Sequence, residues 1–250
     1  MKSILRNNYI CLILAISLLA CSRNNQVPDE VPEEKLDVLA FTKTGGFRHD
    51  CIEPGGAALK EYFEERNINY TQSEDTSLFE GNKLEEFDVV IFFQTSGNVL
   101  DSIQQEALVK HVKAGKGFVG IHAAADAEYD WAWYAGLVGA QFESHANIQE
   151  ATIVKVDTHH LASKHLPDRW SRTDEWYNFR QVPSNVHVLL SIDETTYEGG
   201  THGDSHPMAW YHEYDGGRSF YTALGHTVES YSDTLFLRHV YEGVKWAGSR

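Results

Sequence analysis

A continuous apolar run at residues 88–93, Asp-Val-Val-Ile-Phe-Phe, constrains the fold more than any other segment. A strand without polar alternation is typical of a parallel sheet, in which both faces are covered. Shorter apolar runs at 36–41 and 118–121 predict two further strands, and residues 54–66 and 101–114 between the three runs have apolar side chains at helical spacing. This alternation of strands and helices predicts a doubly wound α/β sheet.

The order of these elements also predicts where a ligand binds. Ligands of doubly wound sheets bind beyond the carboxyl ends of the strands. We therefore expect the loops at 43–50, 94–98 and 122–126 to share one rim of the sheet.

The second half of the chain is richer in strands and shows no internal repeat. We expect one domain, from residue 36 to residue 250. Its second half should contain strands at 151–156, 186–192, 208–214 and 218–224 and a final helix at 233–246.

The N-terminal segment is predicted to lie outside this domain. Residues 1–20 combine Lys2 and Arg6 with an apolar stretch too short for an ordinary membrane span. The stretch ends in Leu-Leu-Ala-Cys at Cys21, which resembles the lipobox of bacterial lipoproteins. That resemblance implies cleavage before Cys21 and its lipidation; an ordinary secretory signal is the alternative. Both place the domain outside the cytoplasm.

A lipid on Cys21 would attach the protein to the cell envelope. Ser22 then favours the outer membrane over the inner one, and the polar segment 21–35 should be a flexible tether. The formal net charge of −15 argues against nucleic acid as a partner and against charge-driven adhesion to anionic lipid. Membrane contact is therefore expected through the lipid alone.

Cysteine usage excludes a disulfide within the domain. Cys11 lies in the predicted signal segment and Cys21 is the predicted lipidation site, so Cys51 is left alone. We interpret Cys51 as a small packed residue, because no local signature supports a nucleophile.

The turn after the strand at 118–121 carries the most informative histidine. Small residues surround His122 in Gly-Ile-His-Ala-Ala-Ala-Asp, at the place where nucleophile-elbow enzymes carry Ser or Cys. A histidine at such an elbow suits a general base or a metal ligand. The alternative is a rim histidine that hydrogen-bonds only to nearby backbone. Asp126 follows on the same turn.

Three further polar clusters are candidates for binding or catalysis. Arg48 and His49 follow the first strand, although Arg48 could instead pair with Asp50 to hold the loop. The acids and ring in Asp174-Glu175-Trp176 suit a sugar's hydroxyls and apolar face, and they equally suit a half-buried strand. The third cluster contains His226 and Glu229, in which the acid would orient the histidine.

Other histidines are weaker candidates. We expect His159 and His160 to be solvated, and His145 and His206 to contribute less than the four clusters. No histidine pair has a known zinc-signature spacing. A divalent metal ion on His49, His122 and His226 is therefore permitted by the sequence without being required.

Several motifs in order resemble those of the ThuA-like family, named for trehalose utilisation. They are Gly-Gly-Phe-Arg-His-Asp (45–50), Gly-Phe-Val-Gly-Ile-His-Ala-Ala-Ala-Asp (117–126), Tyr-Asp-Trp-Ala-Trp-Tyr (129–134), Asp-Glu-Trp-Tyr-Asn-Phe-Arg (174–180), His-Pro-Met-Ala-Trp (206–210) and Gly-Arg-Ser-Phe-Tyr-Thr-Ala-Leu-Gly-His-Thr (217–227). The resemblance covers residues 36–246. It implies a flavodoxin-like three-layer α/β/α sandwich of the class I glutamine amidotransferase-like type.

The same resemblance assigns roles to individual residues. His122 stands where an amidotransferase has its nucleophilic Cys, and His226 with Glu229 resembles that family's His-x-Glu with one extra residue between them. Without a thiol no thioester can form, so a functional glutamine amidotransferase is not expected.

The family association with sugar catabolism implies action on a keto-sugar or 3-keto-glycoside by acid/base cleavage or isomerisation, with or without metal assistance. The alternative is a non-catalytic carbohydrate-binding lipoprotein. In the catalytic case we expect His122, His226 and Glu229 to act on a small carbohydrate. The expected substrate-binding residues are Arg48, His49, Asp126, Asp174, Glu175 and Trp176.

Overall fold

The computed structural model describes residues 35–181 and 184–249. The predicted signal segment, Cys21 and all but the last residue of the predicted tether lie outside the described residues. Within the described part of the chain, no helix is long and apolar enough to cross a membrane.

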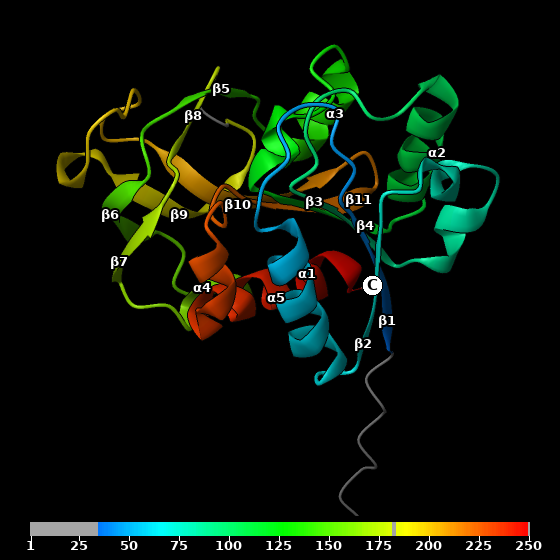
Figure 1. Cartoon of the computed structure of the whole chain (residues 1–250), viewed down its shortest axis with the longest axis horizontal. Helices are drawn as coiled ribbons and strands as arrows, with labels where there is room; N and C mark the ends of the chain where they lie inside the picture. The colour runs from blue at the N-terminus through cyan, green and yellow to red at the C-terminus, as the bar shows by residue number, and fades with distance from the viewer. Residues whose placement is uncertain (1–34, 182–183, 250) are drawn as a thin grey trace, which may run out of the picture. The chain divides into compact units, whose positions relative to one another are not determined.

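A nine-stranded sheet forms the centre of the domain, and its first half is parallel (Figure 1). The strand order β2-β1-β3-β4-β11 is the flavodoxin-like order of a doubly wound sheet. The parallel strands are β1 (Leu36–Phe41), β2 (Ile68–Ser73), β3 (Val89–Phe93), β4 (Gly117–Ile121) and β11 (Gly217–Thr222). All residues of β3 and β4 are buried, as their apolar sequences predicted.

The other half of the sheet is antiparallel and continues from β11. Its strands, in spatial order, are β10 (Pro207–Tyr214), β9 (His187–Asp193), β6 (Gln149–Lys155) and β7 (Arg169–Asp174). A separate two-stranded sheet pairs β5 (Phe142–His145) with β8 (Tyr177–Phe179). The predicted strands of the second half are present, and β5, β7 and β8 are additional to them; the 174–180 motif spans the end of β7, a turn and β8.

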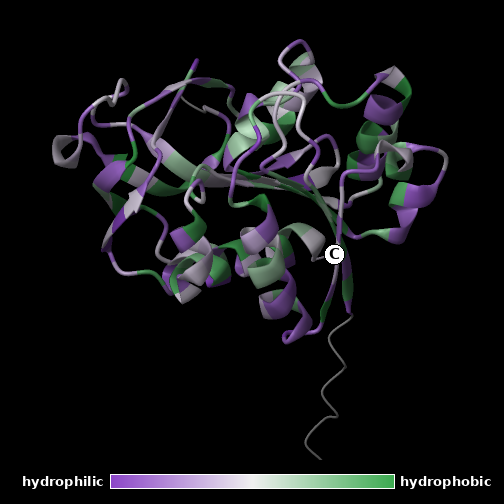
Figure 2. Cartoon of the chain, in the orientation of Figure 1, coloured by the Kyte–Doolittle hydropathy of each residue, from purple (hydrophilic) through white to green (hydrophobic). Residues whose placement is uncertain are grey.

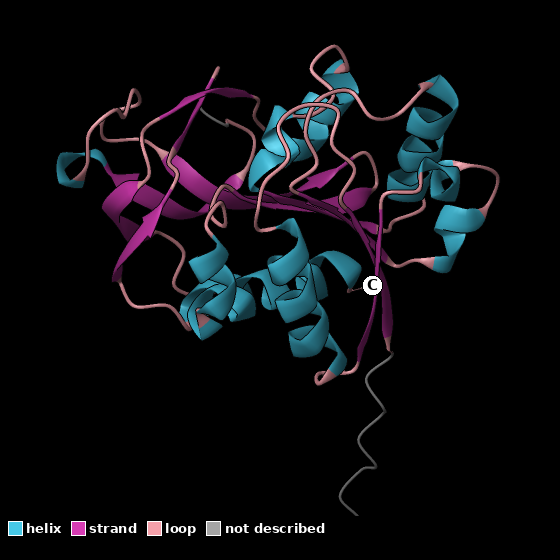
Figure 3. Cartoon of the chain, viewed as in Figure 1, coloured by secondary structure: helices cyan, strands magenta, loops and turns pink. Residues whose placement is uncertain are grey.

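Helices cover both faces of the sheet and complete three layers (Figure 3). On one face lie α1 (Ile52–Glu64), α4 (Leu161–Lys164) and α5 (Thr234–Gly248); on the other lie α2 (Ser102–Lys113) and α3 (Ala132–Val138). Five short 3-10 helices are η1 (Thr76–Phe79), η2 (Lys83–Glu86), η3 (His122–Asp126), η4 (Glu194–Thr196) and η5 (Val228–Ser232). The three-layer α/β/α prediction is confirmed.

Hydropathy follows this layering. The central strands are largely hydrophobic, whereas the helices combine hydrophobic and hydrophilic positions (Figure 2). Helix α2 begins as predicted at Asp101, whose side chain accepts hydrogen bonds from the backbone N–H groups of Ile103 and Gln104. The Gln104 side chain accepts from the Asp101 N–H in return, so α2 starts with a capping box.

The loops at the carboxyl edge of the parallel strands lie together. Isolated β-bridges join Thr44 with Ser96 and Gly97 with Ala127. These bridges connect the three loops that the sequence placed on one rim. That expectation is confirmed.

The turn after β4 has the geometry of a nucleophile elbow. His122 has a φ of +49°, a left-handed backbone conformation that is costly for a residue with a side chain. Gly120 must be small, because a Cβ there would lie 2.8 Å from Tyr221 Cδ2 and 3.1 Å from Ala124 Cβ. The Tyr221 hydroxyl donates to the His122 carbonyl at 2.8 Å and holds the turn. The chain continues from the elbow directly into the short 3-10 helix η3.

Candidate functional site

Four side chains from distant parts of the chain converge at this rim. His49, His122, Glu175 and His226 each offer one donor atom, and these atoms all lie within 4.8 Å of one another. The residues follow β1, β4, β7 and β11, so the sheet brings them together. We call these four residues the histidine–glutamate cluster.

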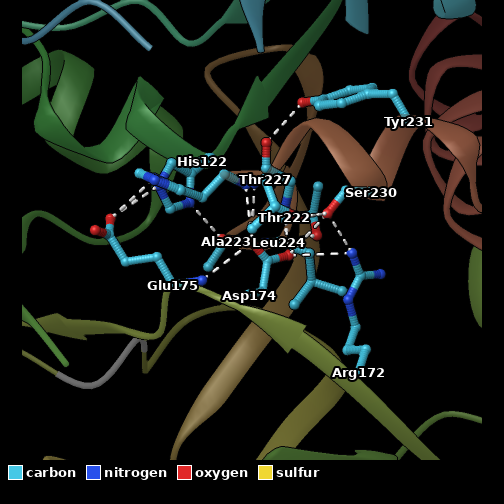
Figure 4. A network of polar contacts seen from close by, with 12 residues as sticks. His122, Arg172, Asp174, Glu175, Thr222, Ala223, Leu224, Thr227, Ser230 and Tyr231 are labelled. Atoms are coloured by element: carbon cyan, nitrogen blue, oxygen red, sulfur yellow. Dashed lines mark hydrogen bonds and ion pairs between the residues drawn. The ribbon is translucent and has the colours of Figure 1, made fainter. Parts of the chain in front are cut away.

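His122 is fully buried and its ring is held in one orientation. Its Nδ1 lies 2.6 Å from the carbonyl oxygen of Ala223 (Figure 4). Its ring lies 4.0 Å from the ring of Tyr177 between centroids. A carbonyl only accepts hydrogen bonds, so Nδ1 carries the proton and Nε2 presents its lone pair when the ring is neutral. This is the usual second-shell arrangement of a metal-binding histidine.

Three donor atoms of the cluster form a nearly equilateral triangle. His122 Nε2 lies 3.2 Å from His226 Nδ1 and 3.3 Å from Glu175 Oε2, and the last two atoms are 3.2 Å apart. With neutral rings, at most one proton is available for these three contacts. Ligands bound at about 2.0–2.2 Å to one ion lie roughly 3.0–3.5 Å apart, so a single cation would satisfy all three atoms.

His49 completes the cluster as a neutral histidine. It is buried, its ring lies edge-on to His122 and His226 at 5.2 and 4.9 Å between centroids, and its Nδ1 is buried without a hydrogen-bond partner. Burial, followed by the neighbouring His122 and His226, lowers the pKa of His49 to about 3. Metal ligation requires a neutral imidazole, and His49 meets this requirement.

Glu175 and His226 shift each other's pKa. Burial alone would raise the pKa of Glu175, but the adjacent rings of His122 and His226 outweigh it and hold that pKa well below its usual range. Burial would lower the pKa of His226, but Glu175 outweighs it and raises the pKa. Glu175 is therefore a carboxylate, and the donor set of three imidazoles and one carboxylate suits a divalent transition metal.

Asp174 positions the loop that carries His226 (Figure 4). Its fully buried carboxylate accepts hydrogen bonds from the backbone N–H groups of Gly225 (2.8 Å), His226 (3.0 Å) and Thr227 (3.3 Å). It also pairs with the buried guanidinium of Arg172 at 3.1 Å. The residue next to Glu175 in the chain therefore holds the opposite side of the cluster in place.

Four predicted site residues lie in surroundings that do not suit their predicted roles. Asp174 and Trp176 are fully buried, and the Trp176 indole donates to the Gln149 carbonyl, so neither presents a surface to a sugar. Arg48 was predicted to bind substrate or to pair with Asp50. It forms ion pairs with Glu53 (2.5 Å) and Glu74 (2.8 Å) instead. Glu229 is exposed on η5, and within the described part of the chain it makes no contact with His226. The carboxylate that contacts His226 is that of Glu175.

Asp126 remains at the site, on the turn that carries His122. It is half-buried, and the hydroxyl of Tyr129 donates to its carboxylate. Burial raises its pKa, even though the Tyr129 hydrogen bond and nearby His122 act in the opposite direction. A partly buried carboxylate with a raised pKa is suited to proton transfer.

One histidine beside the cluster had been expected to contribute little. His145, on β5, lies 3.1 Å from the second carboxylate oxygen of Glu175, and its side chain is 48% exposed. Its only signal in the sequence was its residue type. His206 is buried between Glu194 (2.7 Å) and the Tyr177 carbonyl (2.7 Å), which is a structural role.

Two other expectations have clear outcomes. His159 is exposed as expected, but His160 is half-buried and stacks on Tyr211, so it is not simply solvated. Cys51 is a buried free thiol that donates to the Gly225 carbonyl at 3.5 Å. Burial raises its pKa to about 12, which agrees with a packed residue and not a nucleophile.

Solved structures show that the fold is similar to that of an amidotransferase and of ThuA-like proteins. A glutamine amidotransferase from Thermotoga maritima superposes with a TM-score of 0.50 at 15% identity, covering 87% of this chain and all of that one. A ThuA-like protein from Bacteroides uniformis gives 0.72 at 20% identity (88% and 94% covered), and one from Parabacteroides merdae gives 0.70 at 19% (86% and 91%).

The sequence identifies the family. The model of the ThuA family, described as trehalose utilisation, matches residues 37–247, so the chain belongs to this family. The resemblance found in the motifs is confirmed, and the family suggests a role in carbohydrate metabolism. No curated protein matches the sequence.

The Asp174 network gives a stability prediction. Replacing Asp174 by Ala leaves Arg172 as a buried charge without its partner, which should lower the free energy of unfolding by about 3–5 kcal/mol in urea denaturation. Glu85→Ala is the control, because Glu85 pairs with Lys110 at 2.6 Å and both side chains are more than half exposed. Equal losses in the two variants would contradict the assigned role of Asp174.

The cluster gives a binding prediction. Purified protein should bind about one Zn²⁺, Mn²⁺ or Co²⁺ ion per chain in calorimetry, and Glu175→Gln should weaken this binding by more than about tenfold, since loss of a second-shell partner alone costs 10–100-fold. Glu229→Gln is the matched control and should bind as the wild type does. Absence of binding in the wild type, or equal weakening by both variants, would refute the site.

Proposed function

We propose that this protein is a metal-assisted enzyme that acts on a keto-sugar or 3-keto-glycoside. The triangle of His122, His226 and Glu175 donor atoms is the observation that carries this proposal. Its support is twofold: the donor set suits a divalent ion, and the family suggests carbohydrate metabolism. The elbow position holds a histidine instead of a nucleophile, which favours chemistry without a covalent intermediate.

A ketone at C3 of a sugar ring makes the hydrogen on C2 acidic. A cation on the cluster would polarise that carbonyl and stabilise the negative charge that develops on its oxygen. Asp126 is placed on the same rim to remove the C2 proton. The electron pair then moves toward C1, the glycosidic C–O bond breaks, and the departing oxygen takes the proton back from Asp126. The products are an unsaturated keto-sugar and the free alcohol.

Binding and proton transfer are assigned to different residues in this proposal. Tyr177 and the Ala223 carbonyl hold His122, and Asp174 holds the loop of His226, so the cluster is pre-organised. Asp126 is not one of the four donor residues, so a metal ion on the cluster would leave its carboxylate available for proton transfer. Its loss should therefore lower turnover without releasing the metal.

The test is product analysis on a panel of glucosides and their 3-keto forms, with and without divalent metals. Metal-loaded wild type should cleave or isomerise only keto forms, and Asp126→Asn should lower kcat by about 10²–10⁴-fold while metal affinity stays unchanged. Asp130→Asn, on the exposed residue four positions later, is the matched control. Binding of sugars without product under any metal would instead support the carbohydrate-binding alternative.

We also propose that the domain acts outside the cytoplasm, attached to the outer membrane through lipid on Cys21. The supporting observations are the lipobox-like Leu-Leu-Ala-Cys and the polar segment that follows it. Cells expressing the full chain should incorporate labelled fatty acid into the protein and keep it in the membrane fraction. Cys21→Ser should abolish both, whereas Cys11→Ser should leave both intact; a labelled Cys21→Ser protein would refute the anchor.

A further inference from the structure

Phe47 is an exposed aromatic residue on a fixed backbone. The residue is 65% exposed. The N–H groups of Gly45 and Gly46 donate to the Ser96 carbonyl at 2.6 and 3.1 Å, and the Ser96 hydroxyl donates to the Phe47 carbonyl at 2.6 Å. The exposure of this ring is therefore a property of the folded site and not of a loose loop.

The Phe47 ring is in direct contact with the histidine–glutamate cluster. It meets the ring of His49 at 4.9 Å between centroids and at 88° between planes. Such a perpendicular contact covers at most one face of the phenyl ring. An open aromatic face thus lies beside a buried polar centre.

An exposed apolar side chain normally needs no explanation, but the surroundings of Phe47 differ from those of the other examples. The remaining large exposed apolar side chains of the described residues are Ile103, Ile148, Val156, Leu161 and Val228. Phe47 is the aromatic member of this set, and its ring contacts a cluster residue. Flat apolar faces beside polar groups are what a sugar ring requires, since its C–H face is apolar and its edge is polar.

We infer that Phe47 is the stacking platform for the pyranose ring of the substrate, and that it selects cyclic glycosides over open-chain sugars. This inference rests on the proposed function, which it deepens by naming the substrate class. The ring of the glycoside lies on the phenyl face, and its oxygens point to the cluster. Phe47 is a specificity-determining residue and takes no part in proton transfer or metal binding.

The experiment compares Phe47→Ala, Phe47→Trp and the wild type, all loaded with metal. For 3-keto-pyranosides, Phe47→Ala should raise KM about three- to tenfold with little change in kcat, and Phe47→Trp should keep KM near the wild-type value. For open-chain hydroxyketones, and for metal affinity, all three proteins should behave alike. Leu161→Ala, which removes an exposed apolar side chain on α4, should change none of these values.

Calorimetric binding of unoxidised methyl glucosides to the same proteins separates this inference from the proposed reaction. Wild-type binding that Phe47→Ala weakens and Phe47→Trp keeps supports stacking even when no keto-glycoside is turned over. Turnover with an unchanged KM in Phe47→Ala overturns stacking and leaves the proposed function standing. Equal losses for cyclic and open-chain ligands, or no binding of any pyranoside by the wild type, also overturn it.

Discussion

The buried carboxylate of Asp174 is the interaction on which the site depends. It accepts hydrogen bonds from the backbone N–H groups of buried Gly225 and partly buried His226 and Thr227. The same side chain offsets the charge of buried Arg172, which in turn donates to Ser230 at 2.6 Å. Because Glu175 follows Asp174 directly, one short segment supplies a cluster donor and fixes the loop of another. This coupling ties the antiparallel half of the sheet to the parallel half at the functional rim.

The elbow shows how a shared backbone geometry can support different chemistry. In an amidotransferase-like fold the strained position after β4 projects one side chain into the rim, and here that side chain is His122 with a φ of +49°. The left-handed conformation of His122 is maintained by packing of Gly120 against Tyr221 and by the Tyr221 hydrogen bond to the His122 carbonyl. With Nδ1 bonded to the Ala223 carbonyl, the histidine presents the lone pair of Nε2 to the rim, in the arrangement of a metal-binding histidine.

Local patterns carried most of the fold prediction. The apolar run of β3 and the helical spacing of α2 depend on short-range preferences, so both elements were predicted from the sequence. His122 and His226 were singled out because each follows a strand at a small residue, a signal that lies within a few positions. Glu229 was wrongly preferred to Glu175 as the partner of His226 because it is closer in sequence. Separation along the chain says little about separation across a rim at which four strands end.

The sequence alone determined the class of fold, its ThuA-like family membership and the rim on which functional groups gather, because these follow from hydrophobic period, strand order and motif order. Only the tertiary structure decided which side chains face one another. Trp176 is turned into the core and Arg48 toward Glu53 and Glu74, while Glu175 is brought to His122 and His226. The physical reason is that a side chain's role depends on burial and on partners contributed by distant strands, and no local pattern contains either.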